Sequence, residues 1–331
     1  MRRILITGGT GFVGSHLIRL LKSSGAKLTV VSSSNPELRE PGVHYFNVDI
    51  RNADDVRMVV REAGPNQIYH LAGVSMVADS WTNPRQTFDI NVIGSYNVFE
   101  AAMSISSPPR ILNVSTSQVY APSDSALTET SPLDPGNPYA ATKGMVELLM
   151  VQYRKFGSGG IITARAFNHT GPGQLPSFAL PSFAKQLVEM EVGLISPTLK
   201  VGNINVKRDF TDVRDVVVAY CRLVERGKLG EIYNVCSGRG VSLADIVREL
   251  QKNCSTSVRI EVDKSRLRSS EPSQVIGDYA KLRTATGWNP QITLERTLKD
   301  LLDYWRTKIK QDRRGRSDVE TVGKIESIGE S

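Results

Sequence analysis

The sequence has few cysteines, few histidines and no long apolar run, and each shortage excludes a class of protein. Only three cysteines and four histidines occur among its 331 residues. Cys221, Cys236 and Cys254 are odd in number and lack the paired spacing of a zinc site, so neither a metal centre nor a disulfide framework is indicated. We expect all three thiols to be small buried hydrophobic groups.

The longest apolar runs are too short to cross a membrane. No segment approaches the roughly 18 uninterrupted apolar residues of a spanning helix, and Met1-Arg2-Arg3 leads directly into a short strand and a glycine cluster rather than a signal peptide. We therefore expect no membrane partner and a cytoplasmic location. Hydrophobic residues make up 40% and charged residues 23%, which is ordinary globular usage and excludes disorder of the whole chain.

The basic charge of the chain is concentrated near its end. Lysine and arginine number 41 against 34 acids, a net charge of +7. Six cations and one anion between residues 306 and 317 account for +5, which leaves +2 for the rest. The balanced remainder argues against a nucleic-acid partner and favours a small phosphate-bearing ligand. An RNA-binding or redox-sensing protein is a remote alternative that only this basic segment supports.

The hydrophobic pattern alternates between strands and helices in the first half. This alternation predicts βαβ crossovers and an α/β fold, a Rossmann-type doubly wound parallel sheet over residues 1–167. We expect a smaller mixed α/β C-terminal substrate domain over 168–305, with some later segments returning to the first domain, and a basic, weakly ordered tail over 306–331. The expected strands are Arg3–Thr7, Leu28–Val31, Gln67–Leu71, Arg110–Val114 and Ile161–Ala166, and the expected helices are Phe12–Ser24, Pro84–Met103, Pro138–Phe156, Leu180–Glu191, Val213–Glu225 and Ser242–Lys252.

A glycine-rich loop joins the first strand to the first helix. Glycines at three-residue spacing allow a tight turn, let backbone N–H groups approach a pyrophosphate, and place the anion at a helix N-terminus. In this strand–helix context the loop predicts a dinucleotide cofactor. The candidate cofactor residues here are Gly8, Gly11, Phe12, Val13 and Gly14.

The residues that follow the second strand indicate which nicotinamide cofactor binds. NAD-binding proteins usually carry an acid there, whereas this chain has Ser32 and Ser33 and no acid before Glu37. We therefore favour NADP(H), with NAD(H) possible, and expect Ser32, Ser33 and Arg39 to be available for a 2′-phosphate. Asp49 and Ile50 follow another short strand, where they could contact the adenine, or Asp49 could cap the next helix.

A tyrosine and a lysine four residues apart are the candidate catalytic pair. Tyr139 and Lys143 share one helical face, where the ammonium can lower the pKa of the phenol and make it a proton donor or acceptor. The same spacing recurs at Tyr304 and Lys308, so spacing alone has little meaning. Only the first copy follows a strand that ends in hydroxyls, at Ser115-Thr116-Ser117, where a parallel sheet usually has its active site.

The chain resembles the extended short-chain dehydrogenase/reductases of the nucleotide-sugar type. The resemblance covers residues 1–305, and the motifs that carry it in the first half are Thr7–Gly14, His70–Gly73, Asn91–Gly94, Ser115–Tyr120, Asn137–Lys143 and Arg165–His169. The resemblance implies that Thr116, Tyr139 and Lys143 are catalytic. It also implies cofactor contacts from Leu71, Ala72, Gly73 and Asn91, although His70 and Asn91 could instead satisfy buried backbone groups. By the same resemblance, helices 84–103 and 138–156 would form a homodimer interface.

Two residues beside Thr116 narrow the chemistry within this family. Gln118 stands where the 4,6-dehydratases carry an acid, and Ser117 stands where the 3,5-epimerase-reductases carry a cysteine, so neither base is available. Reduction of a ketone, or C4 epimerisation through a transient ketone, remains. A GDP-mannose 4,6-dehydratase with an unusual base and tightly bound NAD is a further alternative.

The second half resembles the GDP-sugar members of the family, with Ala166 where a proline is common. The resemblance implies reduction of the C4 ketone of GDP-4-dehydro-6-deoxy-D-mannose to a GDP-6-deoxyhexose such as GDP-D-rhamnose. Arg208 offers a planar fork for a diphosphate, Arg268 and Glu271 could serve the diphosphate and the ribose or base, and Lys185 is either a phosphate contact or a solvated lysine. The candidate substrate residues are Ser117, Gln118, Asn168, Ser177, Phe178, Lys185, Val201, Asn203, Arg208, Arg268 and Glu271.

Overall fold

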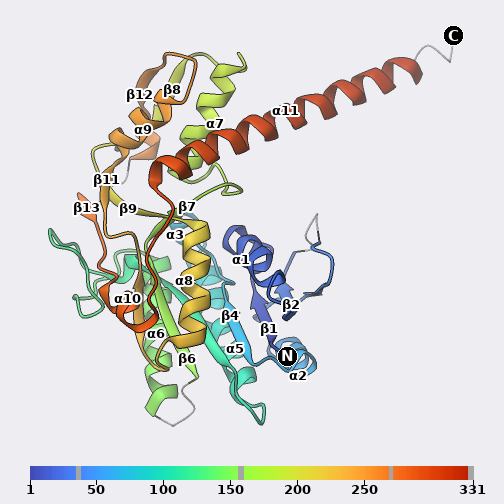
Figure 1. Cartoon of the computed structure of the whole chain (residues 1–331), viewed down its shortest axis with the longest axis vertical. Coiled ribbons are helices and arrows are strands. Elements are labelled where there is room, and N and C mark those ends of the chain that lie inside the picture. Colours follow the sequence, from blue (N-terminus) through green and yellow to red (C-terminus); the bar gives the residue numbers. More distant parts are fainter. Residues whose placement is uncertain (35–38, 156–159, 268–270, 327–331) are drawn as a thin grey trace. The chain divides into compact units, whose positions relative to one another are not determined.

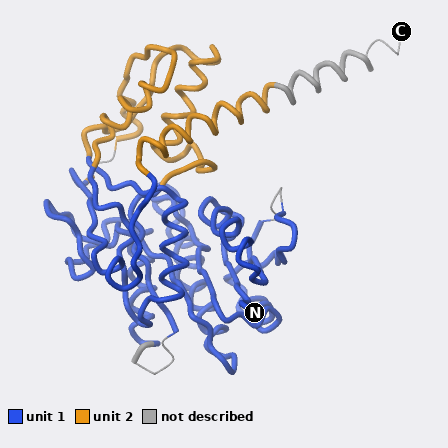
Figure 2. The backbone as a smooth tube through the Cα atoms, viewed as in Figure 1, with its two compact units in different colours: residues 1–169, 207–240, 272–292 blue, residues 170–206, 241–271, 293–331 orange. Residues whose placement is uncertain are grey.

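The chain is divided into two compact units. The computed structural model describes residues 1–34, 39–155, 160–267 and 271–326, without the side chains of 154–155 and 314–326. Unit 1 consists of residues 1–169, 207–240 and 272–292, and unit 2 of residues 170–206, 241–271 and 293–331 (Figure 2). The expected boundary at 167/168 therefore lies near the end of the first segment of unit 1 only, because two later segments of the chain also belong to that unit.

Unit 1 is built on a seven-stranded parallel sheet, which confirms the predicted Rossmann-type fold (Figure 1). The strand order is β10-β6-β5-β4-β1-β2-β3, in which the order reverses direction beside β1, so the loops after β1 and β4 lie next to each other. The strands are β1 (Arg3–Thr7), β2 (Lys27–Ser32), β3 (Val43–Asn47), β4 (Gln67–His70), β5 (Arg110–Thr116), β6 (Ile161–Ala166) and β10 (Ile232–Val235).

Helices cover both faces of this sheet. On one face α1 (Phe12–Lys22), α8 (Val213–Arg226) and α10 (Ala280–Thr286) pack their apolar sides against the strands, as Leu17 and Leu223 do. On the other face α2 (Ala53–Ala63), α5 (Gly94–Met103) and α6 (Pro138–Lys155) form a second core. Burial on both faces is why the strands are nearly continuous apolar runs in the sequence.

The helix expected over 84–103 is interrupted in the structure. It consists of α4 (Pro84–Phe88), a π-helical turn η1 (Asp89–Ile93) and α5, and it is preceded by the short helix α3 (Val77–Thr82). A π turn accommodates one extra residue per turn and so rotates the side chains that follow it. Asn91 lies in this turn and is 1% exposed, with its amide directed into the protein rather than to solvent.

Unit 2 contains most of the remaining helices. It includes α7 (Ala179–Glu191), β8 (Thr198–Val201), α9 (Leu243–Lys252), β12 (Arg259–Val262), the turn η3 (Lys264–Arg266) and α11 (Leu294–Glu326). β8 and β12 pair in parallel, with Leu199 opposite Ile260.

The remaining short elements lie outside these two groups. In unit 1 they are η2 (Ser117–Val119), β9 (Lys207–Asp212) and β13 (Gln274–Val275), and at the points where the chain passes from one unit to the other they are β7 (Asn168–Thr170) and β11 (Gly240–Ser242).

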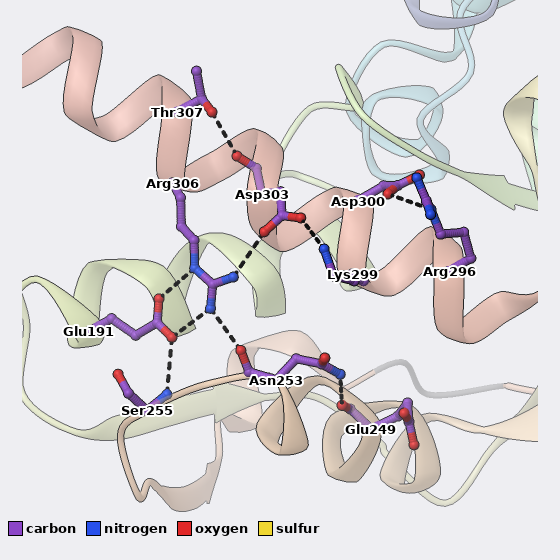
Figure 3. Close-up of polar contacts among 10 residues, drawn as sticks. All are labelled: Glu191, Glu249, Asn253, Ser255, Arg296, Lys299, Asp300, Asp303, Arg306 and Thr307. Carbon is purple, nitrogen blue, oxygen red and sulfur yellow. Dashed lines mark hydrogen bonds and ion pairs between the residues drawn. The ribbon is translucent and has the colours of Figure 1, made fainter.

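The segment expected to be a tail begins inside an ordered helix. α11 continues without a break from Leu294 to Glu326, and Ile309 is 7% exposed. Arg306 donates to both oxygens of Glu191 at the end of α7 (2.9 and 2.8 Å), and also to Asp303 and to the backbone of Asn253 (Figure 3). The expectation of a tail from residue 306 is therefore wrong at its start, because Arg306 and Ile309 pack within unit 2.

The structure shows the environment of the three cysteines and the character of the helices. All three cysteines are free thiols; Cys236 is buried as expected, whereas Cys221 and Cys254 are only partly buried. None of the described helices combines the length and the apolar character that spanning a membrane requires.

Candidate active site

The glycine loop after β1 has the geometry of an anion cradle. Gly8 adopts φ +69°, and a Cβ atom there would lie 2.7 Å from the backbone nitrogen of Ala72, so only glycine fits. A Cβ on Gly14 would lie 2.5 Å from Cα of Gly9. Gly11 caps α1 without a side-chain hydrogen bond, and the first turn of α1 holds no acid. This uncapped helix start fits the pyrophosphate of a dinucleotide, with backbone N–H groups of 12–14 as donors, while the N–H of Gly11 closes the turn onto the carbonyl of Gly8.

Hydroxyl groups gather at the carboxyl end of β2. The Oγ atoms of Ser32 and Thr10 are 2.7 Å apart, and the backbone N–H of Ser34 donates to Ser32. Ser33 is exposed, and Arg39 is exposed and lies over the ring of Tyr45. These groups can accept or donate hydrogen bonds without placing a negative charge beside a 2′-phosphate.

Asp49 is bound by its own neighbour and does not cap a helix. Arg51 donates to Asp49 from its backbone and its guanidinium, which lowers the pKa of the Asp49 carboxyl. The cap of α2 is Asn52, which accepts from the N–H groups of Asp54 and Asp55. The cap alternative for Asp49 is therefore wrong, and the side chain of Ile50 is buried against Gly94.

The segment after β4 lies directly against the glycine loop. Leu71 donates its N–H to the carbonyl of Thr7, and Ala72 donates to the hydroxyl of the same threonine. Beside Gly73, the amide oxygen of Asn91 accepts from the N–H of Val74 at 2.8 Å, and Asn91 Nδ2 donates to Thr142 on α6. Asn91 thus satisfies a backbone group, as the structural alternative expected, and does so next to the cofactor loop.

His70 is a buried structural residue. Its two ring nitrogens contact the hydroxyls of Thr7 (2.7 Å) and Ser95 (2.8 Å). Burial lowers the pKa of His70 to about 3, with the nearby charge of Lys143 acting in the same direction. The ring is therefore neutral at physiological pH and fastens β4 to β1 and α5.

The three expected catalytic side chains meet at the end of β5. Thr116 is the last residue of β5, and Tyr139 and Lys143 lie on the first two turns of α6. The N–H of Gln118 donates to Thr116 Oγ1, which leaves the hydroxyl proton of Thr116 available to a second group. Lys143 Nζ donates to the carbonyl of Val114 at 2.8 Å. Burial lowers the pKa of Lys143 to about 8, opposed by the carboxylate of Glu147.

The pKa of Tyr139 is raised, which is opposite to the direction expected from Lys143 on the same helical face. The phenol is 8% exposed, and burial is the larger effect because it disfavours phenolate. A hydrogen bond with the Thr116 side chain acts in the opposite direction and is weaker. The protonated phenol is consequently the form present at neutral pH, which suits a proton donor.

An amide pair connects the start of α6 to the turn after β5. Asn137 Nδ2 donates to Gln118 Oε1 at 3.0 Å, and Asn137 Oδ1 accepts from the N–H of Ala140. With Oε1 of Gln118 engaged, its NH₂ group is the part that remains for a ligand. Asn137 is not among the site residues expected from the sequence, although an asparagine directly before a helix-starting proline is a capping signal that could have identified it.

The other expected substrate residues are distributed over both units. In unit 1, Asn168 begins β7, Ser117 is 5% exposed, and Arg208 donates to the carbonyls of Lys207 and Pro272. In unit 2, Lys185 forms an ion pair with Glu189 at 3.0 Å, and the side chain of Val201 is fully buried, so only its backbone could contact a ligand. Ser177 is exposed, Phe178, Asn203 and Glu271 are partly buried, and Arg268 lies outside the described residues.

The described residues carry hydrogen-bonding and proton-transfer groups at the site and show no cluster of metal ligands. Over residues 1–34, 39–155, 160–267 and 271–326, no three His, Cys, Asp or Glu side chains are grouped as metal ligands. The donors at the site are instead hydroxyls, amides, one phenol and one ammonium, which suit proton transfer and hydrogen bonding to a polar organic ligand.

Comparison with known proteins agrees with this geometry over nearly the whole chain. The sequence profile of the family described as GDP-mannose 4,6 dehydratase matches residues 5–301. GDP-6-deoxy-D-mannose reductase of Pseudomonas aeruginosa is 33% identical over 314 residues, which are 94% of this chain and 99% of that protein. GDP-6-deoxy-D-talose 4-dehydrogenase of Aggregatibacter actinomycetemcomitans is 28% identical and covers 89% of this chain and 95% of its own length.

Solved structures give the same result. The structure of RMD from Pseudomonas aeruginosa complexed with NADPH superimposes with a TM-score of 0.82 at 34% identity, covering 93% of this chain and all of that chain. UDP-glucose 4-epimerase of Thermus thermophilus in complex with NAD has a TM-score of 0.82 at 26% identity, over 92% and 99% of the two chains. The chain therefore belongs to the extended short-chain dehydrogenase/reductases of the nucleotide-sugar type, a family of NAD(P)-dependent oxidoreductases.

Proposed function

We propose that the protein reduces the C4 ketone of GDP-4-dehydro-6-deoxy-D-mannose with NADPH and forms a GDP-6-deoxyhexose, GDP-D-rhamnose. The observation that carries the proposal is the buried Tyr139, whose pKa is raised by burial, beside Thr116 and Lys143, with an amide at position 118. This set can protonate an oxygen but has no carboxylate placed to remove a carbon-bound proton. The likeness to the Pseudomonas reductase supports the same substrate.

The proposed mechanism assigns one task to each side chain. NADPH supplies the hydride when bound. The hydroxyl of Thr116, whose oxygen accepts from Gln118 N–H, exchanges its hydrogen bond with Tyr139 for one to the C4 carbonyl and so orients that carbonyl. Tyr139 donates its phenolic proton to the C4 oxygen as that oxygen gains charge. Lys143, held by the carbonyl of Val114, binds the ribose hydroxyls and stabilises the phenolate left on Tyr139.

NADP(H) is the cofactor that the end of β2 favours. Thr10 and Ser32 present hydroxyls there, and Ser33 is exposed beside them. Among the residues that the structure describes after β2, Glu40 is the next acid, and its charge is paired with Lys22 at 2.9 Å. We therefore expect kcat/KM to be higher with NADPH than with NADH, and Ser32→Asp to reverse that order by repelling the 2′-phosphate.

The proposed ligand contacts are the residues expected from the sequence, except that Val201 contributes only its backbone and Lys185 must first leave an ion pair. The proposed substrate contacts are Ser117, Gln118, Asn168, Ser177, Phe178, Asn203, Arg208, Arg268 and Glu271, with the backbone of Val201. Lys185 is bound to Glu189 in this structure and would have to exchange that ion pair for a phosphate. The proposed cofactor contacts are those of the glycine loop, Ser32, Ser33, Asp49, Ile50, Leu71–Gly73 and Asn91, with Tyr139 and Lys143.

A homodimer is part of the proposal. Exposed apolar side chains gather on α4, η1, α5 and α6, which contact one another. They are Phe88, Ile93, Tyr96, Met145, Leu148 and Val151, each between 36% and 67% exposed. Burial of these side chains against a second copy would remove apolar surface from water. The cytoplasmic location stays a prediction from the sequence.

The decisive experiment incubates the purified protein with GDP-mannose, a separate dehydratase that makes the ketone, and NADPH or NADH. The expected result is stoichiometric NADPH oxidation and a GDP-6-deoxyhexose identified by NMR. No NADPH loss in the presence of the ketone would refute the proposal. An NAD that copurifies and never turns over would instead favour a C4 epimerase or a dehydratase.

The second tyrosine–lysine pair provides a matched control for the chemistry. Tyr139→Phe is expected to lower kcat by about 10²- to 10⁴-fold, because it removes the proton donor. Tyr304→Phe changes the same atoms in the other copy of the spacing, where Tyr304 packs edge-on against Trp305. We expect that variant to keep its activity within about twofold.

A further inference from the structure

A buried carboxylate lies one helical turn beyond the catalytic lysine. Glu147 follows Lys143 by four residues on α6, so the two side chains share one face of the helix. The Glu147 side chain is 5% exposed, and Arg165 on β6 is 3% exposed. Arg165 Nη2 lies 2.6 Å from one oxygen of Glu147, and its Nε lies 3.1 Å from each. Both ends of the pair are fixed by a planar, two-point contact.

Glu147 also binds the strand that carries the catalytic threonine. Ser115 Oγ donates to Glu147 Oε1 at 2.5 Å, and Ser115 directly precedes Thr116. The carbonyl of Val114, the residue before, accepts from Lys143. One carboxylate therefore connects α6 to β5 and β6 at the level of the catalytic groups.

Arg165 is itself held on its other side. Its Nη1 donates to the carbonyl of Glu129 at 3.2 Å, and its guanidinium lies 4.7 Å from the centre of the Tyr120 ring. Tyr120 is fixed in turn by its hydroxyl, which donates to Asn234 at 2.6 Å. The arginine cannot move away from Glu147 without breaking these contacts.

We propose that Glu147 is a positioning residue for the reaction: it fastens α6 to β5 through Ser115 and to β6 through Arg165, and so holds Tyr139 and Lys143 opposite Thr116. The proposal rests on the proposed function of the Thr116, Tyr139 and Lys143 site. Glu147 acts through its neighbours and touches no reacting atom. A shift of α6 by a fraction of a turn would separate the phenol from Thr116, with which it forms a hydrogen bond.

The charge of Glu147 affects the pKa of Lys143, a quantity that would not change if Glu147 only stabilised the fold. Burial disfavours the ammonium of Lys143, and Glu147 opposes that effect and raises the Lys143 pKa. The other groups that face this cluster are His70 from β4, Tyr139 from α6, Arg165 from β6, and Tyr120 and Glu129 from the segment between β5 and α6. His70 is neutral and contributes no charge. Glu147 is the acidic group that shares a helical face with Lys143.

The test is Glu147→Gln, which keeps the size of the side chain and removes its charge. We expect kcat to fall about 100-fold, because a misplacement of about 1 Å has that effect, with the KM for the sugar unchanged. The alkaline limb of kcat/KM should move to lower pH by about one unit. Lysine side-chain NMR, with the Lys143 signal assigned by its absence in Lys143→Arg, should show the same downward shift of the titration midpoint.

Two further variants separate positioning from fold support. Asp215→Asn removes a carboxylate of similar burial, 6% exposed, that accepts from the N–H groups of Gln291 and Ile292. It should leave the Lys143 midpoint and the pH profile unchanged. Glu147→Gln combined with Arg165→Gln removes both charges, so that no unpaired ion is left if the single variant fails to fold; it should still lower the midpoint and kcat.

The outcomes distinguish this proposal from the proposed function. An unmoved Lys143 midpoint and an unmoved alkaline limb in Glu147→Gln or in the double variant would overturn the positioning role, even if kcat falls. Failure of both variants to fold would reduce Glu147 to a fold requirement and would also overturn it. If the wild type consumes no NADPH with the ketone, the proposed function fails, while the NMR midpoint still decides the role of Glu147.

Discussion

Two arginine–glutamate pairs in this protein have almost the same geometry and very different surroundings. In unit 1, Arg165 and Glu147 are 3% and 5% exposed. In unit 2, Arg306 and Glu191 are 36% and 10% exposed (Figure 3). Each guanidinium reaches both oxygens of its carboxylate, and each makes a further hydrogen bond to a backbone carbonyl. Arg306 also binds Asp303 and Arg165 lies over the Tyr120 ring, but the main difference between the pairs is the access of water.

The difference shows that the same contact can have two uses. A buried pair contributes little net stability when intact, because both ions lose their hydration, but removing one partner is costly because the other charge stays buried. A partly exposed pair can be broken at low cost, because water replaces the lost partner. The first therefore fixes a geometry, here that of the catalytic helix, and the second fastens α11 to α7.

Breaking the buried pair is expected to have the largest effect. Arg165→Met removes the cation and leaves Glu147 buried without its partner, so the free energy of unfolding should fall by about 3–5 kcal/mol. Urea denaturation followed by circular dichroism measures this change. A loss below about 1 kcal/mol would show that water reaches Glu147 and would remove the contrast between the two pairs.

Lowering the pH should affect unit 1 before it affects the exposed pair. The pKa of buried His70 is about 3, below its ordinary value of 6.5, so between these values the unfolded chain binds more protons and stability is lost as the pH falls. The slope is about 1.4 kcal/mol per pH unit, or about 2 kcal/mol between pH 6.5 and 5. Denaturation at several pH values measures it, and His70→Gln should reduce the slope.

The exposed pair responds in a lower pH range. Arg306 lowers the pKa of Glu191 below its ordinary value of 4.5, so its contribution is complete above that value and is lost as the pH falls through the lowered pKa. The partly buried His169, whose pKa is also lowered, adds to the loss that starts near pH 6.5. A stability that is flat from pH 6.5 to 5 would contradict the lowered pKa of both histidines.

Local patterns in the sequence were sufficient to predict the parallel sheet and the glycine loop. They also pointed to Thr116, Tyr139 and Lys143 as candidate catalytic groups, because Tyr139 and Lys143 share a helical face and Thr116 ends a strand. The hydrogen bond between Asn91 and Val74 could not be predicted in this way, because only the folded chain brings the two residues into reach.

Burial explains the remaining differences. The raised pKa of Tyr139 follows from its exposure of 8%, which depends on packing rather than on the neighbouring lysine. Glu147 could have been noticed from its spacing to Lys143, but its partners Ser115 and Arg165 lie 32 and 18 residues away. Similarly, the sequence around Arg306 indicates a charged tail, because its partner Glu191 lies 115 residues earlier and is brought into contact only by folding.

Breaking the exposed pair should have a smaller effect than breaking the buried one. Arg306→Met is expected to lower the free energy of unfolding by about 1 kcal/mol, because Glu191 can be rehydrated once its partner is removed. About 1 M salt should weaken the wild-type pair and leave Arg165 with Glu147 unaffected, since only the exposed pair is screened. Denaturation curves with and without salt measure both effects; a loss equal to that of Arg165→Met would contradict the comparison.

Removing residues 311–331 should have the smallest effect on stability of all these changes. The chain would then stop after Lys310, so it keeps Arg306 with Glu191 and the buried Ile309, whereas residues 311–313 are exposed. We expect a change of about 0.5 kcal/mol or less and NADPH turnover within about twofold of the full chain. Ending the chain after Trp305 instead removes both contacts and should cost more stability than Arg306→Met, because burial of Ile309 is lost as well. A marked loss of activity on removal of 311–331 alone would show that the basic segment acts in ligand binding, and it would revive the nucleic-acid alternative that the balanced charge of the remaining chain argues against.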